Sequence, residues 1–239
     1  MIDPAVLGAR LAGVRARIAR AADRAGRDPA SVRLVAISKT FPPEYVRAAA
    51  LAGQIDFGEN KVQEALQKMA RTSDLQIRWH LVGHLQSNKA RKAGRQFDVI
   101  HSIDHAALLT TVDEEAQAAG RKVQLFVQVD LAGELTKHGA REEELPAIFE
   151  AANACVAARL SGLMLLPPAT ENPEEARLYF RELRALRDRP LAGGVDGSRL
   201  RVLSMGMSHD FEVAIEEGAT LVRIGTAVFG NRASDGDDT

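Results

Sequence analysis

The stretch RLVAISK at residues 33–39 joins a short apolar run to a lysine, and its apolar part is the first of eight similar runs. Short runs rich in β-branched residues or Leu, bounded by polar residues, are typical of buried strands. The other seven lie at 55–58, 77–83, 99–103, 123–131, 160–166, 201–205 and 221–225. Eight such strands predict a closed barrel.

Helical patterns separate the eight runs, which indicates repeated βα units. They lie at 43–52, 61–69, 88–95, 104–119, 142–158, 173–187 and 210–217, after a first helix at about 4–25. We predict the α/β class and a single TIM-type (β/α)8 barrel domain over residues 1–230. We expect a disordered polar tail at 231–239, so the N-terminal helix should cover the place of an eighth crossover helix.

An open, doubly wound parallel sheet is the alternative architecture, because the number of strands alone does not prove closure. The glycine-rich GxGxxG turn of dinucleotide-binding sheets does not follow the first run. The segment GGVDGS at 193–198, before the seventh run, predicts a flexible loop. The barrel is the favoured prediction.

The composition narrows the class of protein. Hydrophobic residues make up 46% of the 239 residues, and 31 basic residues nearly balance 32 acidic ones, so the basic surface of a nucleic-acid-binding protein is not expected. A lone Cys155 excludes an internal disulfide and fits a reducing compartment. Neither a signal segment nor an apolar run of membrane-spanning length is present. We predict a cytoplasmic protein without nucleic-acid or membrane partners.

Lys39 directly follows the first run, at the carboxyl end of a predicted strand. Parallel barrels build their active sites from the residues at these ends. A lysine there is often only a rim residue whose amine reaches water. One that attacks an aldehyde needs its pKa lowered from about 10.4 toward 7 or 8, which desolvation or positive neighbours at a barrel mouth can provide.

Two turns of small residues follow the last two predicted strands. They are SMGMS at 204–208 and RIGT at 223–226. The loops after strands seven and eight commonly bind phosphate in this fold, since their backbone N–H groups and hydroxyls can cradle an anion. Arg223 stands two residues before Gly225, so both face the same side of a strand. A lysine and a phosphate cradle at one barrel mouth predict pyridoxal 5′-phosphate (PLP) as the cofactor.

Four motifs in order resemble the YggS/PROSC family of pyridoxal phosphate homeostasis proteins. They are VAISKT at 35–40, FGENKVQE at 57–64, WHLVGHLQSNK at 79–89 and LSMGMS at 203–208. The resemblance extends from the N-terminal helix to Gly230. It implies a barrel like the N-terminal domain of alanine racemase and an internal Schiff base between PLP and Lys39. His209 and Lys61 depart from the family pattern, which affects only the rim of the site.

The same resemblance implies roles for further residues. Ser204, Gly206, Gly225 and Thr226 would hold the phosphate, Arg223 would meet the pyridine nitrogen, and Asn60 and His80 would contribute to the pocket. An arginine at the ring nitrogen opposes its protonation and so weakens the ring as an electron sink. The resemblance therefore implies a PLP-binding protein of intracellular PLP homeostasis without catalytic turnover, which could buffer PLP, deliver it to apoenzymes or act indirectly.

A weak PLP-dependent racemase is the alternative function. Two-base racemization needs acid–base groups on both faces of the substrate, and related racemases supply a tyrosine from a second, β-rich domain. Here Tyr45 and Tyr179 both fall in predicted helices, so neither is an obvious second base, whereas His80 or His84 could replace it. Because the related racemases dimerise through that second domain, we expect a monomer.

A metal-dependent hydrolase is a third possibility, because two histidine pairs are spaced four residues apart. The pairs are His80 with His84 and His101 with His105. Such a pair binds zinc when both members share a helix face, but His80 falls in a strand-like run and the HExxH pattern is missing. The sequence therefore predicts no metal site.

Overall fold

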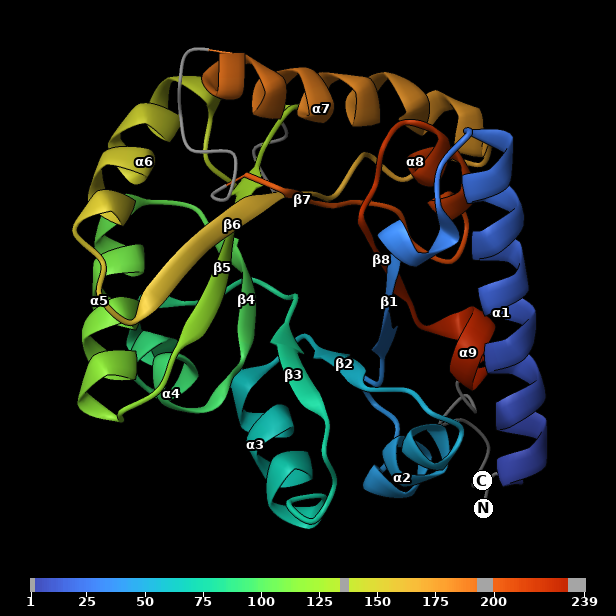
Figure 1. The fold of residues 1–239 in the computed structure, drawn as a ribbon. Helices are drawn as coiled ribbons and strands as arrows, with labels where there is room; N and C mark the ends of the chain where they lie inside the picture. Colours follow the sequence, from blue (N-terminus) through green and yellow to red (C-terminus); the bar gives the residue numbers. More distant parts are fainter. Residues whose placement is uncertain (1–2, 134–137, 193–199, 232–239) are drawn as a thin grey trace, which may run out of the picture.

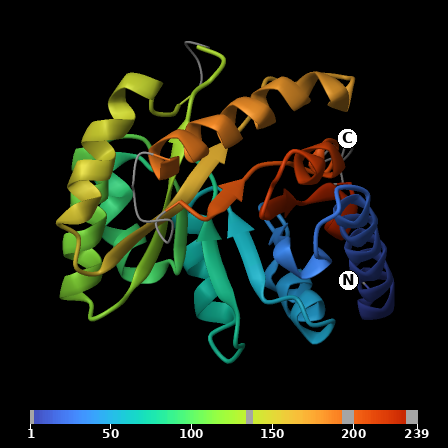
Figure 2. The same cartoon turned by 45° about the horizontal axis from the view of Figure 1, so that its top comes forward.

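The computed structural model of the protein describes residues 3–133, 138–192 and 200–231. Eight parallel strands form a closed barrel in the order β1 to β8, and helices surround it (Figures 1 and 2). The strands are β1 (Arg33–Ile37), β2 (Asp56–Glu59), β3 (Arg78–Leu81), β4 (Val99–Ile103), β5 (Val123–Val129), β6 (Ala158–Leu165), β7 (Val202–Ser204) and β8 (Leu221–Ile224).

The helices alternate with these strands as the sequence predicts. The α-helices are α1 (Pro4–Arg24), α2 (Pro43–Leu51), α3 (Val62–Arg71), α4 (Ser87–Gln96), α5 (Ala106–Ala118), α6 (Leu145–Asn153), α7 (Arg177–Ala192), α8 (Phe211–Glu216) and α9 (Thr226–Phe229). Short 3-10 turns are η1 (Pro29–Ser31), η2 (Glu142–Glu144) and η3 (Pro173–Ala176). None of the helices in the described ranges is long and apolar enough to span a membrane.

Closure of the barrel rests on the pairing of its first and last strands. In the parallel ladder between β1 and β8, Val35 lies opposite Arg223 and Ala36 lies opposite Ile224. This pairing excludes the open sheet considered as the alternative. It also brings residues that follow β1 next to residues that follow β8, although they are almost 190 positions apart in the chain.

The strands alternate between two cores. Leu34 and Ala36 belong to the large apolar cluster under the helices, whereas Val35 and Ile37 belong to a smaller cluster inside the barrel. The smaller cluster also contains Val82, Val99, Phe126, Met164 and Leu221. Because strand side chains alternate in direction, β1, β4, β5, β6 and β8 each contribute to both cores.

The N-terminal helix covers the side of the barrel where a long eighth crossover helix would lie. Helix α1 packs against α2, α8 and the single-turn α9 that follows β8 (Figure 1). Its buried side chains are Leu7, Leu11, Val14, Ile18, Ala21 and Ala22, which form one apolar stripe. This confirms the expected role of α1. The predicted loop at 193–198 and all but the first residue of the predicted tail lie outside the described residues.

The helix predicted at 142–158 is shorter than the sequence pattern suggested. Helix α6 ends at Asn153, and β6 already begins at Ala158. The Asp113 carboxylate of α5 accepts hydrogen bonds from the N–H groups of Ala157 and Ala158 at 2.7 and 2.6 Å. This contact with a distant helix fixes the start of the strand, so local periodicity alone could not reveal it.

Candidate functional site

A cavity of about 640 Å³ opens at the carboxyl ends of the strands, which is a size typical of small-molecule sites. Its walls combine apolar side chains with a few polar groups from nearly every strand end. The lining residues are Ile37, Lys39, Asn60, Val82, Gly83, His84, Gln128, Val129, Asp130, His138, Leu166, Met207, Ser208, His209, Arg223, Gly225 and Thr226.

Lys39 extends into this cavity from the end of β1. It is half-buried, and among the described residues its amine has neither a hydrogen bond nor an ion pair. The next residue, Thr40, has a φ of 68°, a strained value for a β-branched residue, and its N–H donates to Glu64 Oε1 at 2.6 Å. The chain thus turns sharply behind an amine that is left available for a ligand.

A second lysine, Lys68 of α3, stabilises this turn through hydrogen bonds. Its buried amine donates to the Ser38 carbonyl at 2.7 Å, to Glu59 Oε1 at 2.7 Å and to Glu64 Oε1 at 2.9 Å. Burial raises the pKa of Glu59, although Lys68 and the Ser38 hydroxyl donate to it. Lys68 is therefore fully engaged in the framework, in contrast to Lys39.

Small residues form the opposite wall, after β7 and β8. The N–H of Gly225 donates to Ser208 Oγ at 3.3 Å, and the N–H of Met207 donates to the Asp210 carboxylate at 2.6 Å. Ser208, Gly225 and Thr226 all line the cavity. Such a turn can bind an oxyanion through hydroxyl and N–H groups.

Arg223 lies at the floor of the cavity and is almost completely buried. Its Nη1 donates to both the carbonyl and the hydroxyl of Ser204 at 2.6 Å, and its Nη2 donates to the Leu165 carbonyl at 2.7 Å. Burial lowers the pKa of Arg223 to about 10, with Asp210 opposing the shift, so the guanidinium stays positive at neutral pH. A fixed cation thus faces the cavity.

A chain of buried hydrogen bonds continues from Arg223 through the barrel. Ser204 Oγ lies 2.9 Å from His101 Nδ1, His101 Nε2 lies 2.9 Å from His80 Nδ1, and His80 Nε2 lies 2.9 Å from Asp56 Oδ1. A carboxylate only accepts, so His80 donates to Asp56 and, being neutral, accepts from His101. His101 in turn accepts from the Ser204 hydroxyl. Each donor in the chain therefore points away from Arg223 toward Asp56.

The protonation states support this direction. Burial lowers the pKa of both His80 and His101, which keeps the two imidazoles neutral. Burial alone would raise the pKa of Asp56, but hydrogen bonds from His80 and the charge of Arg78 outweigh it and lower that pKa. The chain thus runs from a cation at the cavity to an anion near the other end of the barrel.

Of the site residues predicted from the sequence, five line one cavity. These are Lys39, Asn60, Arg223, Gly225 and Thr226. The other three, His80, Ser204 and Gly206, are buried and are not among its lining residues. The structure therefore connects His80 and Ser204 to the cavity through Arg223 rather than by direct exposure.

Several lining residues were not named individually as site residues from the sequence, although Ser208 belongs to the predicted phosphate turn at 204–208. Asp130, His138 and Leu166 follow β5 and β6, and Ser208 belongs to the turn after β7. The rule that singled out Lys39, position just after a strand, identifies Asp130 and Leu166 only from the observed strand ends, because the predicted runs at 123–131 and 160–166 still include both residues. It could not identify His138, which lies nine residues beyond the end of β5.

Comparison with known proteins places the fold in a family. Residues 10–233 match the family described as alanine racemase, N-terminal domain. Alanine racemase of Clostridium difficile superimposes with a TM-score of 0.71 at 13% identity over 96% of this chain and 57% of its own, which shows the shared fold.

Nearer relatives are similar over almost their whole length. A pyridoxal phosphate homeostasis protein of Aquifex aeolicus is 44% identical over 93% of this chain and 97% of its own. A pyridoxal phosphate homeostasis protein of Pseudomonas aeruginosa is 46% identical over 93% of this chain and 94% of its own. PipY of Synechococcus elongatus, solved with PLP bound, has a TM-score of 0.82 at 40% identity over 94% of this chain and 100% of its own. The chain therefore belongs to the alanine racemase N-terminal domain family and, within it, to the pyridoxal phosphate homeostasis proteins.

Proposed function

We propose that the protein binds PLP covalently through the Lys39 amine and serves in the intracellular homeostasis of this cofactor. The observation that carries the proposal is that Lys39 and the turn of Gly225 and Thr226 line the same cavity. They meet there because β1 pairs with β8. The similar protein PipY has been solved with PLP bound, and the curated relatives are named for PLP homeostasis.

The cavity fits each part of the cofactor. The Lys39 amine, which has no partner in the part of the chain that the structure describes, suits an aldehyde, which PLP supplies together with an aromatic ring and a phosphate. Thr226, Ser208 and the backbone of Gly225 suit the phosphate, and the Arg223 cation suits the ring nitrogen. Asn60 adds a polar group to the wall. Ser208 replaces Ser204 in this proposal, because the Ser204 hydroxyl is buried between Arg223 and His101.

The remaining predicted residues act indirectly in this proposal. Ser204 and His80 hold Arg223 in place through the buried hydrogen-bond chain. Gly206 has a φ of 92°, and a Cβ there would lie 2.7 Å from the Cβ of Ala214, so glycine allows the tight turn before Met207. Its carbonyl also accepts from the N–H of Arg223 at 3.0 Å.

We further propose that the protein does not turn over amino acids. Within the described ranges no tyrosine lines the cavity, so the usual second base of a racemase is not supplied there. A weak racemase is the alternative, and it is favoured by the cavity histidines, among them His84, which could act as a base. Incubation of the loaded protein with L- or D-alanine separates the two functions, because only a racemase changes the chirality of the substrate.

We infer that this function takes place in the cytoplasm. The protein would act there as a monomer and exchange PLP with apoenzymes. The lone Cys155 supports a reducing compartment. The near balance of charges supports small-molecule and protein partners rather than nucleic acid.

The decisive experiment reduces PLP-loaded protein with borohydride and locates the added mass by peptide mass spectrometry. In the wild type we expect the label on the peptide that contains Lys39. In Lys39→Ala the corresponding peptide should carry no label. Lys61→Ala is the matched control, since Lys61 is an exposed lysine nearby that does not line the cavity, and it should label like the wild type. Label on other lysines alone, or none in the wild type, would refute the proposal.

A further inference from the structure

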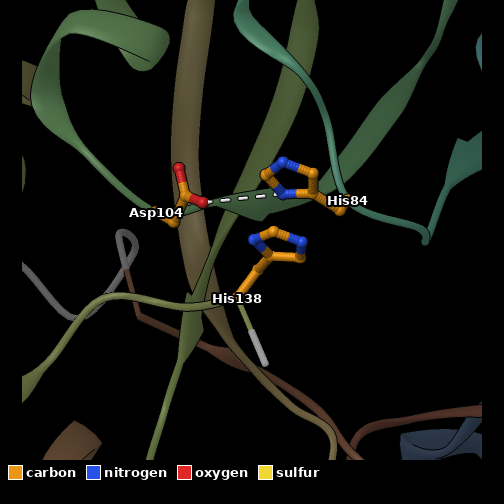
Figure 3. A group of neighbouring side chains, drawn as sticks. All are labelled: His84, Asp104 and His138. Carbon is orange, nitrogen blue, oxygen red and sulfur yellow. Dashed lines mark ion pairs between the residues drawn. The ribbon is translucent and has the colours of Figure 1, made fainter. Parts of the chain in front are cut away.

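Three side chains that can bind a metal meet at the mouth of the barrel. His84 lies between β3 and α4, Asp104 directly follows β4, and His138 lies between β5 and η2 (Figure 3). One ligand atom from each residue lies within 4.8 Å of the other two. The imidazoles of His84 and His138 lie face to face beside the Asp104 carboxylate (Figure 3).

The spacing of His84 and Asp104 fits two ligands of one ion. Nδ1 of His84 lies 3.7 Å from Oδ2 of Asp104, which is too long for a hydrogen bond. Two ligand atoms that each lie about 2.0–2.1 Å from a tetrahedral ion are roughly 3.4 Å apart. A small inward movement of either side chain would bring both atoms to that separation.

The neighbours of Asp104 and His138 hold these ligands in position. His105 Nδ1 lies 2.7 Å from Oδ1 of Asp104, which leaves Oδ2 directed at His84. The Gln128 side chain donates to the His138 carbonyl at 2.5 Å, so the backbone of His138 is tied to β5. Metal sites commonly have such outer contacts, which orient the ligands.

One of the two imidazoles has to change its orientation before both can bind the same ion. The rings are stacked with centroids 3.5 Å apart and planes 9° apart. An ion lies in the plane of each ring that binds it, so one ring has to rotate. His138 is exposed, so its ring is the one expected to rotate.

We propose that His84, Asp104 and His138 form a binding site for a divalent transition-metal ion of the Zn²⁺ type. Two imidazoles and one carboxylate favour Zn²⁺, Co²⁺ or Ni²⁺ over Mg²⁺ and Ca²⁺, which prefer oxygen ligands. Three protein ligands leave at least one coordination position for water. Because His84 and His138 also line the cavity of Lys39, the bound ion stands at its entrance.

This site differs from the metal pairs considered from the sequence. His80 is buried inside the barrel and donates to Asp56, so it does not join His84. His105 contacts the carboxylate of Asp104 and not His101. The three ligands come from three separate loops, which only the closed barrel brings together.

The test is a titration of untagged, chelator-treated and PLP-free full-length protein with Co²⁺, followed by absorbance, and with Zn²⁺, followed by calorimetry. We expect one ion per chain. Binding should weaken by more than about 100-fold in His84→Asn and in His138→Asn, and by about 10-fold in His105→Asn, because loss of a ligand costs more than loss of an outer contact.

Two control variants make the result specific. His209→Asn removes an exposed histidine of the same cavity that lies outside the cluster, and it should bind Co²⁺ like the wild type. Lys39→Ala should also bind Co²⁺ normally, because the metal site does not depend on the proposed PLP lysine. Absence of stoichiometric binding, or equal binding by His84→Asn, His138→Asn and the wild type, would overturn the proposal.

Discussion

Arg223 and Ser204 are joined twice by the same nitrogen, since Nη1 of the arginine donates at 2.6 Å to both the carbonyl and the hydroxyl of the serine. Because the hydroxyl oxygen of Ser204 accepts from Arg223, its proton can be donated to Nδ1 of His101. A residue that resembles a phosphate ligand in the sequence thus serves to fix a buried cation at the floor of the cavity.

Ser204→Ala should lower the free energy of unfolding by about 1–3 kcal/mol, because it leaves the buried Nδ1 of His101 without a donor. Urea denaturation measures the change. Ser161→Ala is the matched control, since Ser161 is also buried on a strand but its hydroxyl makes a single hydrogen bond among the described residues, to the Arg159 carbonyl. Equal losses in both variants would contradict a special role of Ser204.

Arg223→Gln should keep the covalent bond between PLP and Lys39 but shift its absorption band, since the ring would lose its cationic neighbour. The spectrum of the loaded protein, together with borohydride labelling, reports both properties. Arg78→Gln removes the cation at the Asp56 end of the same chain and should leave the band in place. An unchanged band in Arg223→Gln would show that Arg223 does not face the ring.

Acid should destabilise the fold through His80 and His101. Burial lowers the pKa of both imidazoles in the folded protein, so below about pH 6.5 the unfolded chain binds more protons than the folded one. The contribution of the two neutral imidazoles is fully present above that pH and is lost as the pH falls toward their folded pKa values. Urea denaturation at pH 7.5 and 5.5 measures it.

His101→Asn provides the internal comparison for this pH dependence. Removal of one titrating group should make the loss of stability between the two pH values smaller, even though the variant is less stable at neutral pH. His209→Asn removes an exposed histidine and should leave the wild-type pH dependence unchanged. If the wild type had the same free energy of unfolding at both pH values, the hypothesis that His80 and His101 are a buried neutral pair would be wrong.

Gly83→Ala should disturb the cavity wall. A Cβ at this position would lie 2.2 Å from the Asn60 carbonyl oxygen, and backbone cannot give way like a flexible side chain. We expect a loss of about 1–3 kcal/mol in unfolding free energy and weaker PLP binding, since Asn60 lines the cavity. Gly13→Ala, in α1 with no atom within 4 Å of the added Cβ, should instead stabilise by about 0.5–1 kcal/mol.

The sequence by itself determined the order of the elements. Alternating apolar runs and helical patterns identified all eight strands, and the run at 99–103 matches β4 residue for residue. The position of Lys39 at a strand end also followed from the local pattern. This position was informative because a parallel barrel places the carboxyl ends of its strands together. These inferences are strong because hydrophobic periodicity depends only on residues that lie close together in the sequence.

Only the tertiary structure decided which polar groups face one another. The turn of Ser204 away from the cavity depends on Arg223 and His101, which lie on other strands. The cluster of His84, Asp104 and His138 depends on three loops that approach each other when the barrel closes. Hydrogen bonds and metal coordination act over a few ångströms between residues far apart in the chain, so local sequence carries little trace of them.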